Sequence, residues 1–191
     1  MNKTALFPLL LTLTSCLFAD NRLPALARQQ IGVTIEYDPS YVSLKYPGGD
    51  VPQDRGVCTD VVIRAMRHLN FDLQKEVHED MKKNFAAYPS RKNWGLKRPD
   101  KNIDHRRIPN LQTFFKRKGW SLPISQNPAD YQPGDIVTCL LGDTLPHIMI
   151  VSDRKSAEGI PLIIHNIGGG TEEEDCLFTF PLNGHYRPKL K

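Results

Sequence analysis

The hydrophobic pattern of this chain changes once along its length, near Pro133. Before this point, apolar residues recur at the spacing of amphipathic helices. After it, they fall into short β-rich runs separated by turn residues, as in an antiparallel meander. We expect helices over residues 22–32, 58–69, 73–85 and 111–118, and strands over residues 135–141, 147–152, 162–167 and 176–180. Helices followed by a small sheet predict an α+β domain, with the N-terminal helices packed on an antiparallel β-sheet.

The N-terminus has the pattern of an export signal. Lys3 is followed by a short apolar run over residues 5–13, which is too short to span a bilayer. A signal peptide over residues 1–19 would be cleaved after Ala19. Alternatively, residues 13–16 resemble a bacterial lipobox, in which Cys16 is lipidated and becomes the mature N-terminus. Both interpretations predict an exported, periplasmic protein, attached to a membrane only through an N-terminal lipid.

The remaining residues, 20–191, are expected to form one domain, because a chain of this length can bury a single sizeable core. The net charge of +4 is mild, and the basic residues do not alternate with aromatic ones. We therefore expect no nucleic-acid binding. The glycines at 168–170 precede no Lys-Ser/Thr pair or helix, so they are a turn rather than a phosphate loop. We expect a monomer without a cofactor or a metal.

Three cysteines remain once Cys16 is removed or lipidated: Cys58, Cys139 and Cys176. An odd number in an oxidising compartment fits one disulfide and one free thiol. Cys139 and Cys176 lie on expected strands and could pair, or both could be reduced and simply fill the core. Either interpretation leaves Cys58 as the free thiol.

Cys58 stands where a glycine-marked loop gives way to a helix. A helix N-terminus lowers the pKa of a thiol, and a neighbouring histidine can accept its proton. Two later strands carry His147 and His165, so we expect a nucleophile, a base and a residue that orients the base. Asn166 is the alternative orienting residue if the strand register differs by one position.

Further candidates surround this expected triad. The backbone N–H of Cys58 would bind an oxyanion, and Tyr46 and Gln53 are the available side-chain donors. His105, Arg106 and Arg107 could bind a substrate carboxylate. The two arginines could instead pair with nearby aspartates and have only a structural role.

Four motifs in this order resemble the NlpC-type branch of the papain-like cysteine hydrolases, which act on bacterial cell walls. They are a tyrosine-glycine loop (46–49) twelve residues before Cys58, a Gly-Asp-Ile-Val strand (134–137), a His-aliphatic strand (147–151) and an Ile-His-Asn strand (164–166). The resemblance implies a papain-like fold and the roles given above to Cys58, His147 and His165. Residues 46–67 and 104–111 and the strands of His147 and His165 more closely resemble a bacterial group called domain of unknown function 1287. This resemblance spans nearly all of the mature chain and implies no substrate.

The sequence departs from the NlpC pattern in three ways. Val57-Cys58-Thr59 replaces the usual Asp-Cys-Ser, and Met149 replaces a glycine two residues after the expected base. An insertion at about residues 72–130 lengthens the interval between the nucleophile and the base. The substrate groove is therefore expected to differ from that of NlpC enzymes.

The resulting hypothesis is an exported cysteine hydrolase that cleaves an amide or peptide bond, with cell-wall peptides as its expected substrate. One alternative is a non-catalytic module of the same fold that binds cell-wall peptides. A less favoured alternative is a zinc site made by Cys58, His147 and His165, although the sequence contains no closely spaced ligand pair.

Overall fold

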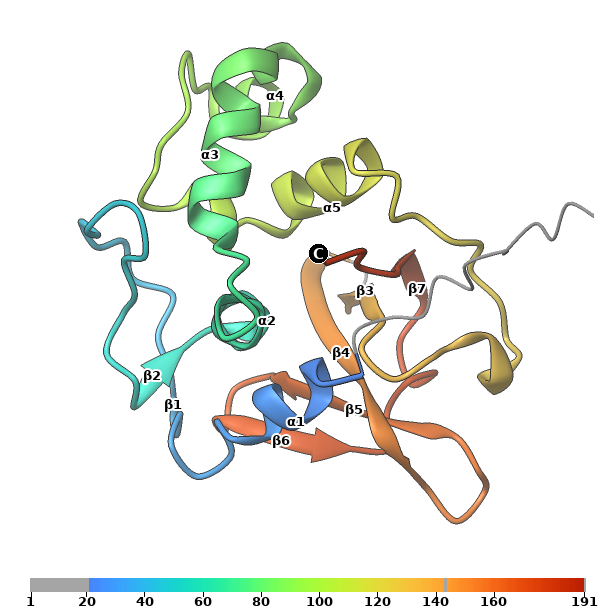
Figure 1. Ribbon diagram of the computed structural model, residues 1–191. Coiled ribbons are helices and arrows are strands. Elements are labelled where there is room, and N and C mark those ends of the chain that lie inside the picture. Colours follow the sequence, from blue (N-terminus) through green and yellow to red (C-terminus); the bar gives the residue numbers. More distant parts are fainter. Residues whose placement is uncertain (1–20, 143, 191) are drawn as a thin grey trace, which may run out of the picture.

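The computed structural model describes residues 21–142 and 144–190. The signal peptide, the lipobox and Cys16 lie outside the described residues. The first part of the chain is mainly helical and the second forms a five-stranded antiparallel sheet (Figure 1), which confirms the expected α+β class. No helix in the described ranges has the length and apolar character needed to cross a membrane.

In the described part of the chain, five α-helices and two very short strands precede the sheet. Their bounds are α1 Leu23–Arg28, β1 Glu36–Tyr37, β2 Arg55–Gly56, α2 Cys58–Arg67, α3 Leu73–Asn84, α4 Ser90–Trp94 and α5 Ile108–Arg117. The expected helices at Cys58 and at residues 73–85 are confirmed, whereas the first helix is shorter than expected. Strand β1 pairs in parallel with β2, so that Tyr37 lies opposite Gly56. This pairing brings Tyr37 close to the start of α2.

The sheet consists of β3 Ile136–Leu141, β4 Leu145–Lys155, β5 Pro161–Asn166, β6 Thr171–Glu174 and β7 Leu182–Tyr186. Its strand order is β6-β5-β4-β3-β7, so the chain returns to pair β7 with β3 instead of continuing a meander. The expected strand over residues 176–180 is wrong, because this segment is irregular and covers the sheet. Strand β6 was missed because three of its four residues are glutamates, which are rare in central strands but tolerated at an edge.

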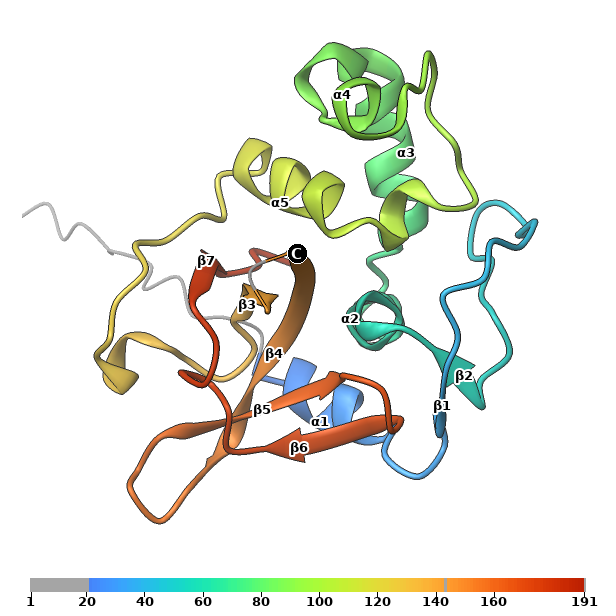
Figure 2. The same ribbon diagram turned by 180° about the vertical axis from the view of Figure 1, so that it is seen from behind.

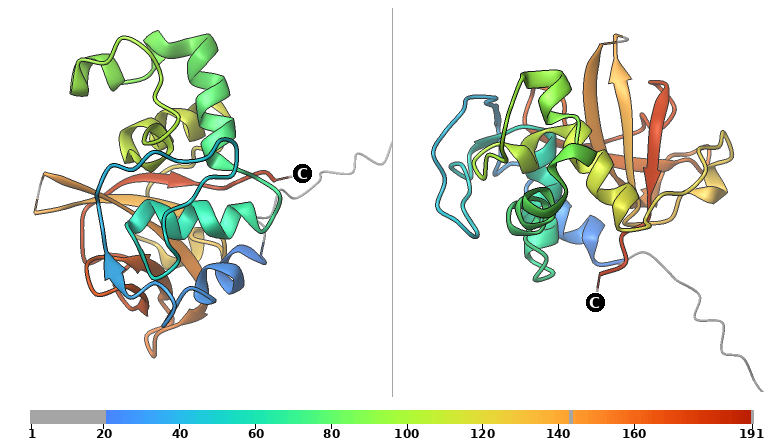
Figure 3. Two further views of the ribbon diagram at one scale, coloured as in Figure 1. Left: turned by 90° about the vertical axis from the view of Figure 1, so that its left-hand side faces the viewer. Right: turned by 90° about the horizontal axis from the view of Figure 1, so that it is seen from above.

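Each face of the sheet carries its own apolar cluster. Helices α1, α2 and α5 cover one face, where Ile148, Ile150 and Ile164 contribute to the larger cluster. The other face is covered by Tyr131 and by the irregular segment 176–181, and it contains Cys139 and Met149. Seen from above, the strands stand between the helices and these covering segments (Figure 3, right). Helices α3 and α4 extend away from the sheet (Figures 1 and 2).

Candidate functional site

Cys58 is the first residue of α2, and a network of hydrogen bonds holds the chain immediately before it. Val57 is extended, and its N–H donates to the Asp60 carboxylate at 2.7 Å. Arg106 pairs with the same carboxylate at 2.8 Å, and both side chains are buried. A side chain at Gly56 would meet Asp60 at about 3.0 Å, so glycine allows the loop to pass this close to the helix. The start of α2 is therefore held in a fixed position.

The thiol of Cys58 is buried, with 4% of the residue exposed. Burial raises its pKa to about 12, while a hydrogen bond from the main-chain N–H of Ile148 acts in the opposite direction. The pairing of β4 with β5 begins at Ile150 and Ile164. Ile148 precedes this first pair and has no partner residue on β5. The N–H of Ile148 is therefore available to the Cys58 thiol. The thiol thus contacts β4 at the residue that follows His147.

His147 and His165 lie side by side on β4 and β5. Nε2 of His147 is 2.7 Å from Nδ1 of His165, and Nε2 of His165 is 2.7 Å from the Glu174 carboxylate. Glu174 is an acceptor, so His165 donates from Nε2 and accepts at Nδ1 from the Nε2–H of His147. This assignment leaves Nδ1 of His147 with an unused lone pair.

The electrostatic environment keeps His147 neutral. Burial and the neighbouring His165 lower the pKa of His147 to about 3. Since the thiol pKa of Cys58 is raised to about 12, both groups are uncharged at neutral pH. The resting site is a thiol and an imidazole, not a thiolate–imidazolium pair.

Cys58 and His147 approach β4 from different sides. Cys58 packs with Ile148 against the helices, whereas His147 lies opposite Cys139, which belongs to the cluster on the other face. Within residues 21–142 and 144–190, no hydrogen bond joins the Cys58 thiol to an imidazole. What links the two residues is the main chain of β4: Ile148, whose N–H bonds the thiol, directly follows His147 at the end where the pairing of β4 with β5 has stopped. Met149 lies on the same side of β4 as His147, away from α2. Its side chain packs in the apolar cluster there, so this position accommodates a residue larger than glycine.

Cys176 is the cysteine that contacts a histidine. Its Sγ is 3.8 Å from Nε2 of His165, on the side of the sheet away from α2. Cys58, Cys139 and Cys176 are all free thiols. Burial raises the pKa of Cys139 to about 11 and that of Cys176 to about 12. The position of Cys176 beside His165 was not expected, because residues 176–180 were predicted to form a strand of the sheet.

The comparison with protein families identifies the chain. The model described as "Domain of unknown function (DUF1287)" matches residues 25–188. The chain belongs to this family. It is 63% identical over 165 residues to YijF of Escherichia coli (strain K12), itself described as uncharacterized, covering 86% of this chain and 80% of that protein.

A comparison with solved structures finds NlpC1 from Trichomonas vaginalis. The TM-score is 0.45 and the identity 14%, over 87% of this chain and 43% of that one. This likeness is too low to be used as evidence of activity.

Two of the expected oxyanion donors lie elsewhere in this DUF1287 chain. The Tyr46 hydroxyl donates to Glu79 on α3 at 2.6 Å, and the exposed Gln53 donates to Asp50 at 3.0 Å. Tyr37 on β1 lies opposite Gly56, two residues before Cys58. Burial raises the pKa of the Tyr37 hydroxyl, and electrostatic interactions with Cys58 and Asp60 act in the same direction. Only the β1–β2 pairing, which the sequence did not reveal, brings Tyr37 there.

Asn166 is not the orienting residue in this geometry. It lies on the helical side of β5, where its amide donates to the carbonyl of Gly56 at 3.2 Å. It therefore braces the loop that precedes Cys58. His165, one residue earlier, faces the opposite side and contacts His147, as the expected register requires.

His105, Arg106 and Arg107 form part of a structural network beside α2. Arg106 is fully engaged with Asp60 and with the carbonyls of residues 38 and 40, so its guanidinium is not free for a substrate. Arg107 pairs with Asp104 and lies over the ring of Trp94. His105 is 2% exposed, and burial together with the nearby Arg106 lowers its pKa to about 3. These contacts favour the structural interpretation of the three residues.

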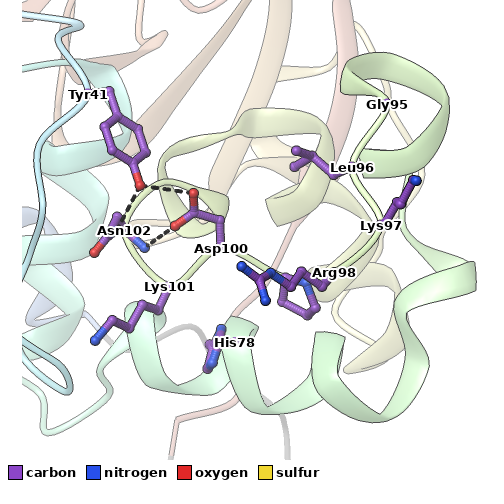
Figure 4. A pocket seen from close by; sticks show the side chains of 10 residues that line it. Tyr41, His78, Gly95, Leu96, Lys97, Arg98, Asp100, Lys101 and Asn102 are labelled. Atoms are coloured by element: carbon purple, nitrogen blue, oxygen red, sulfur yellow. Dashed lines mark hydrogen bonds between the residues drawn. The ribbon is translucent and has the colours of Figure 1, made fainter.

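One cavity of the described structure lies between Tyr41 and the segment that follows α4. It has a volume of about 910 Å³ and is lined by residues 95–102, Tyr41 and His78 (Figure 4). Its cationic side chains are those of Lys97, Arg98 and Lys101, while the Asp100 carboxylate accepts a hydrogen bond from Tyr41 at 3.0 Å. Cys58, His147 and His165 do not line this cavity.

Proposed function

We propose that this DUF1287 protein is a cysteine hydrolase in which Cys58 is the nucleophile, His147 the base and His165 the residue that orients the base. The observation that supports this most directly is the linear arrangement of His147, His165 and Glu174. In this arrangement Nε2 of His147 is hydrogen-bonded to His165. Nδ1 of His147, the ring nitrogen nearer to the main chain, remains available to accept a proton. The Cys58 thiol is hydrogen-bonded to the main-chain N–H of Ile148, the residue that follows His147. The thiol and the available nitrogen therefore lie at one end of the sheet.

The neutral resting pair defines the order of proton transfer. Nδ1 of His147 accepts the thiol proton as sulfur attacks the carbonyl carbon of an amide, because neither group is charged beforehand. The imidazolium then gives this proton to the leaving amine, and a thioester forms. Water attacks the thioester with His147 again acting as base, which releases the acid and restores the thiol. Catalytic hydrogen bonds are often long without substrate, so the Cys58–His147 bond is expected to close when substrate binds.

The oxyanion formed in each attack would be bound at the start of α2. The backbone N–H of Cys58 belongs to the first turn of the helix, where N–H groups lack intrahelical acceptors. The half-buried Tyr37 hydroxyl is the side-chain donor near the sulfur. The reaction therefore requires Cys58, His147 and a donor from β1.

The proposed substrate is a cell-wall peptide, and the proposed location is the periplasm. Both follow from the signal-like N-terminus and from the motifs shared with NlpC-type hydrolases, a papain-like class. The alternative of a cell-wall-binding module without activity makes a different prediction. Such a module would bind the same material without changing it.

Incubation with purified peptidoglycan sacculi, followed by mass spectrometry of the soluble products, tests the proposal. The unmodified protein is expected to release peptides with new amino groups, and C58A and H147A to release none. C139S is the matched control, because Cys139 is also a buried free thiol; it lies opposite His147 on β3, but its sulfur makes no hydrogen bond to either histidine in the described structure. Equal products from C58A would refute the assignment. Binding without products from any variant would favour the binding module.

A further inference from the structure

We propose that His165, Glu174 and Cys176 form a binding site for a transition-metal cation of the Zn²⁺ class. One ligand atom from each residue lies within 4.8 Å of the other two. Nε2 of His165 is 2.7 Å from the Glu174 carboxylate and 3.8 Å from Sγ of Cys176. An imidazole, a carboxylate and a thiol thus converge on one point.

The distances fit a tetrahedral zinc ion after a small movement. With Zn–N near 2.0–2.1 Å and Zn–S near 2.3 Å, a tetrahedral site separates N from S by roughly 3.6 Å. The observed 3.8 Å agrees with this. The carboxylate would have to move by less than about 1 Å, since N and O ligands stand roughly 3.4 Å apart. The Glu174 side chain is 44% exposed, so it is free to make this movement.

The scaffold holds the ligands while leaving one side open. His165 and Glu174 lie on the paired strands β5 and β6, and Cys176 follows β6 by two residues. His165 is 1% exposed, whereas Glu174 is solvent-facing and Cys176 half-buried. Three protein ligands with an open fourth position are typical of non-structural zinc sites. A metal in this position would keep access to water or to a small ligand.

The second nitrogen of His165 has the partner that a metal-bound histidine needs. When Nε2 binds a metal, Nδ1 carries the proton and requires an acceptor. Nε2 of His147 lies 2.7 Å from it. The thiol favours Zn²⁺, Co²⁺ or Cu over Mg²⁺ or Ca²⁺, which prefer oxygen ligands.

This set differs from the zinc site expected from the sequence, which consisted of Cys58, His147 and His165. In the part of the chain that the structure describes, those three residues form no group of converging ligand atoms. Cys58 lies on the helical side of β4, whereas Cys176 contacts His165 from the opposite side of the sheet. The two sets can be separated by single substitutions.

Titration of the reduced protein with Co²⁺ tests the site without any assay of hydrolysis. We expect one equivalent to give the near-ultraviolet absorption of a thiolate-to-cobalt charge transfer, and added Zn²⁺ to displace it. C176S should abolish the band, and H147A should weaken the apparent affinity by roughly 10- to 100-fold through loss of the partner of His165. C139S and C58A should leave the band unchanged.

Circular dichroism on each variant confirms that it is folded. Absence of the band in the unmodified protein would overturn the proposal. So would a band that survives in C176S or disappears in C58A. Because Co²⁺ binding is read out directly, these outcomes are independent of whether the protein hydrolyses cell-wall peptides.

Discussion

The reactivity of Cys58 toward iodoacetamide measures the charge state of the proposed catalytic pair. An ordinary thiol, with a pKa of about 8.5, is a few per cent thiolate at pH 7. With a pKa of about 12, Cys58 is thiolate in about one molecule in 10⁵ at pH 7. This is roughly a 3,000-fold smaller fraction. A more basic thiolate is also more nucleophilic, which recovers roughly 40-fold, because the logarithm of the rate rises by about 0.4–0.5 for each unit of pKa.

Cys58 should therefore be alkylated about a hundredfold more slowly than free cysteine at pH 7, before any further delay due to its burial. The rate should rise about tenfold per pH unit up to pH 10 without levelling, since thiolate is formed throughout this range. Mass spectrometry of the Cys58 peptide at timed intervals gives the rate. H147A should change it little, because His147 takes up the proton only during attack on substrate.

A Cys58 that reacts faster than free cysteine at neutral pH, and that slows in H147A, would refute this reasoning. That result would mean that the pair is already a thiolate and an imidazolium before substrate binds. The neutral imidazole derived from burial would then be wrong. Alkylation of C58A gives the background from the other cysteines.

Three further predictions concern the surrounding residues. Y37F should lower kcat of peptide hydrolysis by about 10²- to 10³-fold, the usual effect of losing an oxyanion donor, while Y46F leaves it unchanged in a steady-state assay. R106A should lower the free energy of unfolding by about 3–5 kcal/mol, because it leaves the buried Asp60 carboxylate without its partner. R107A should lower it by less than half as much, and urea denaturation of both variants measures the difference. Zn²⁺ should inhibit hydrolysis in the unmodified protein but not in C176S, as measured by product formation at increasing concentrations of free zinc.

Helices α1, α2, α3 and α5 were predictable because each carries a regular apolar stripe, whereas the five-residue helix α4 has none and was not expected. Helix α2 begins at Cys58 as expected, and its apolar residues pack on the sheet. The two outer strands were not predictable in this way. Strand β6 is almost entirely glutamate, and β7 contains Asn183 and Gly184, so neither has the apolar character of a strand. They form because an exposed edge of an existing sheet offers their backbones hydrogen-bond partners.

The contacts of the candidate site that could be predicted from the sequence are those between neighbouring strands. The expected contact between His147 and His165 follows from antiparallel pairing, and the two rings do meet. The other contacts depend on long-range folding. A parallel pair of two-residue strands places Tyr37 opposite Gly56, and Cys176 reaches His165 from an irregular segment. No local pattern records such contacts, because burial and topology, not residue type, bring these side chains together.

His165 belongs to both proposals, and its two nitrogens decide between them. In the hydrolase, Nε2–H of His165 donates to Glu174, and Nδ1 accepts the proton of His147 Nε2, which leaves Nδ1 of His147 free as the base. A cation on Nε2 of His165 moves the proton to its Nδ1, which must then donate to Nε2 of His147. A neutral His147 keeps its own proton on Nδ1 in that state, so it has no lone pair for the thiol of Cys58. A metal on one side of the sheet would thus remove the base available on the other, through a single reversed hydrogen bond and without any change of backbone.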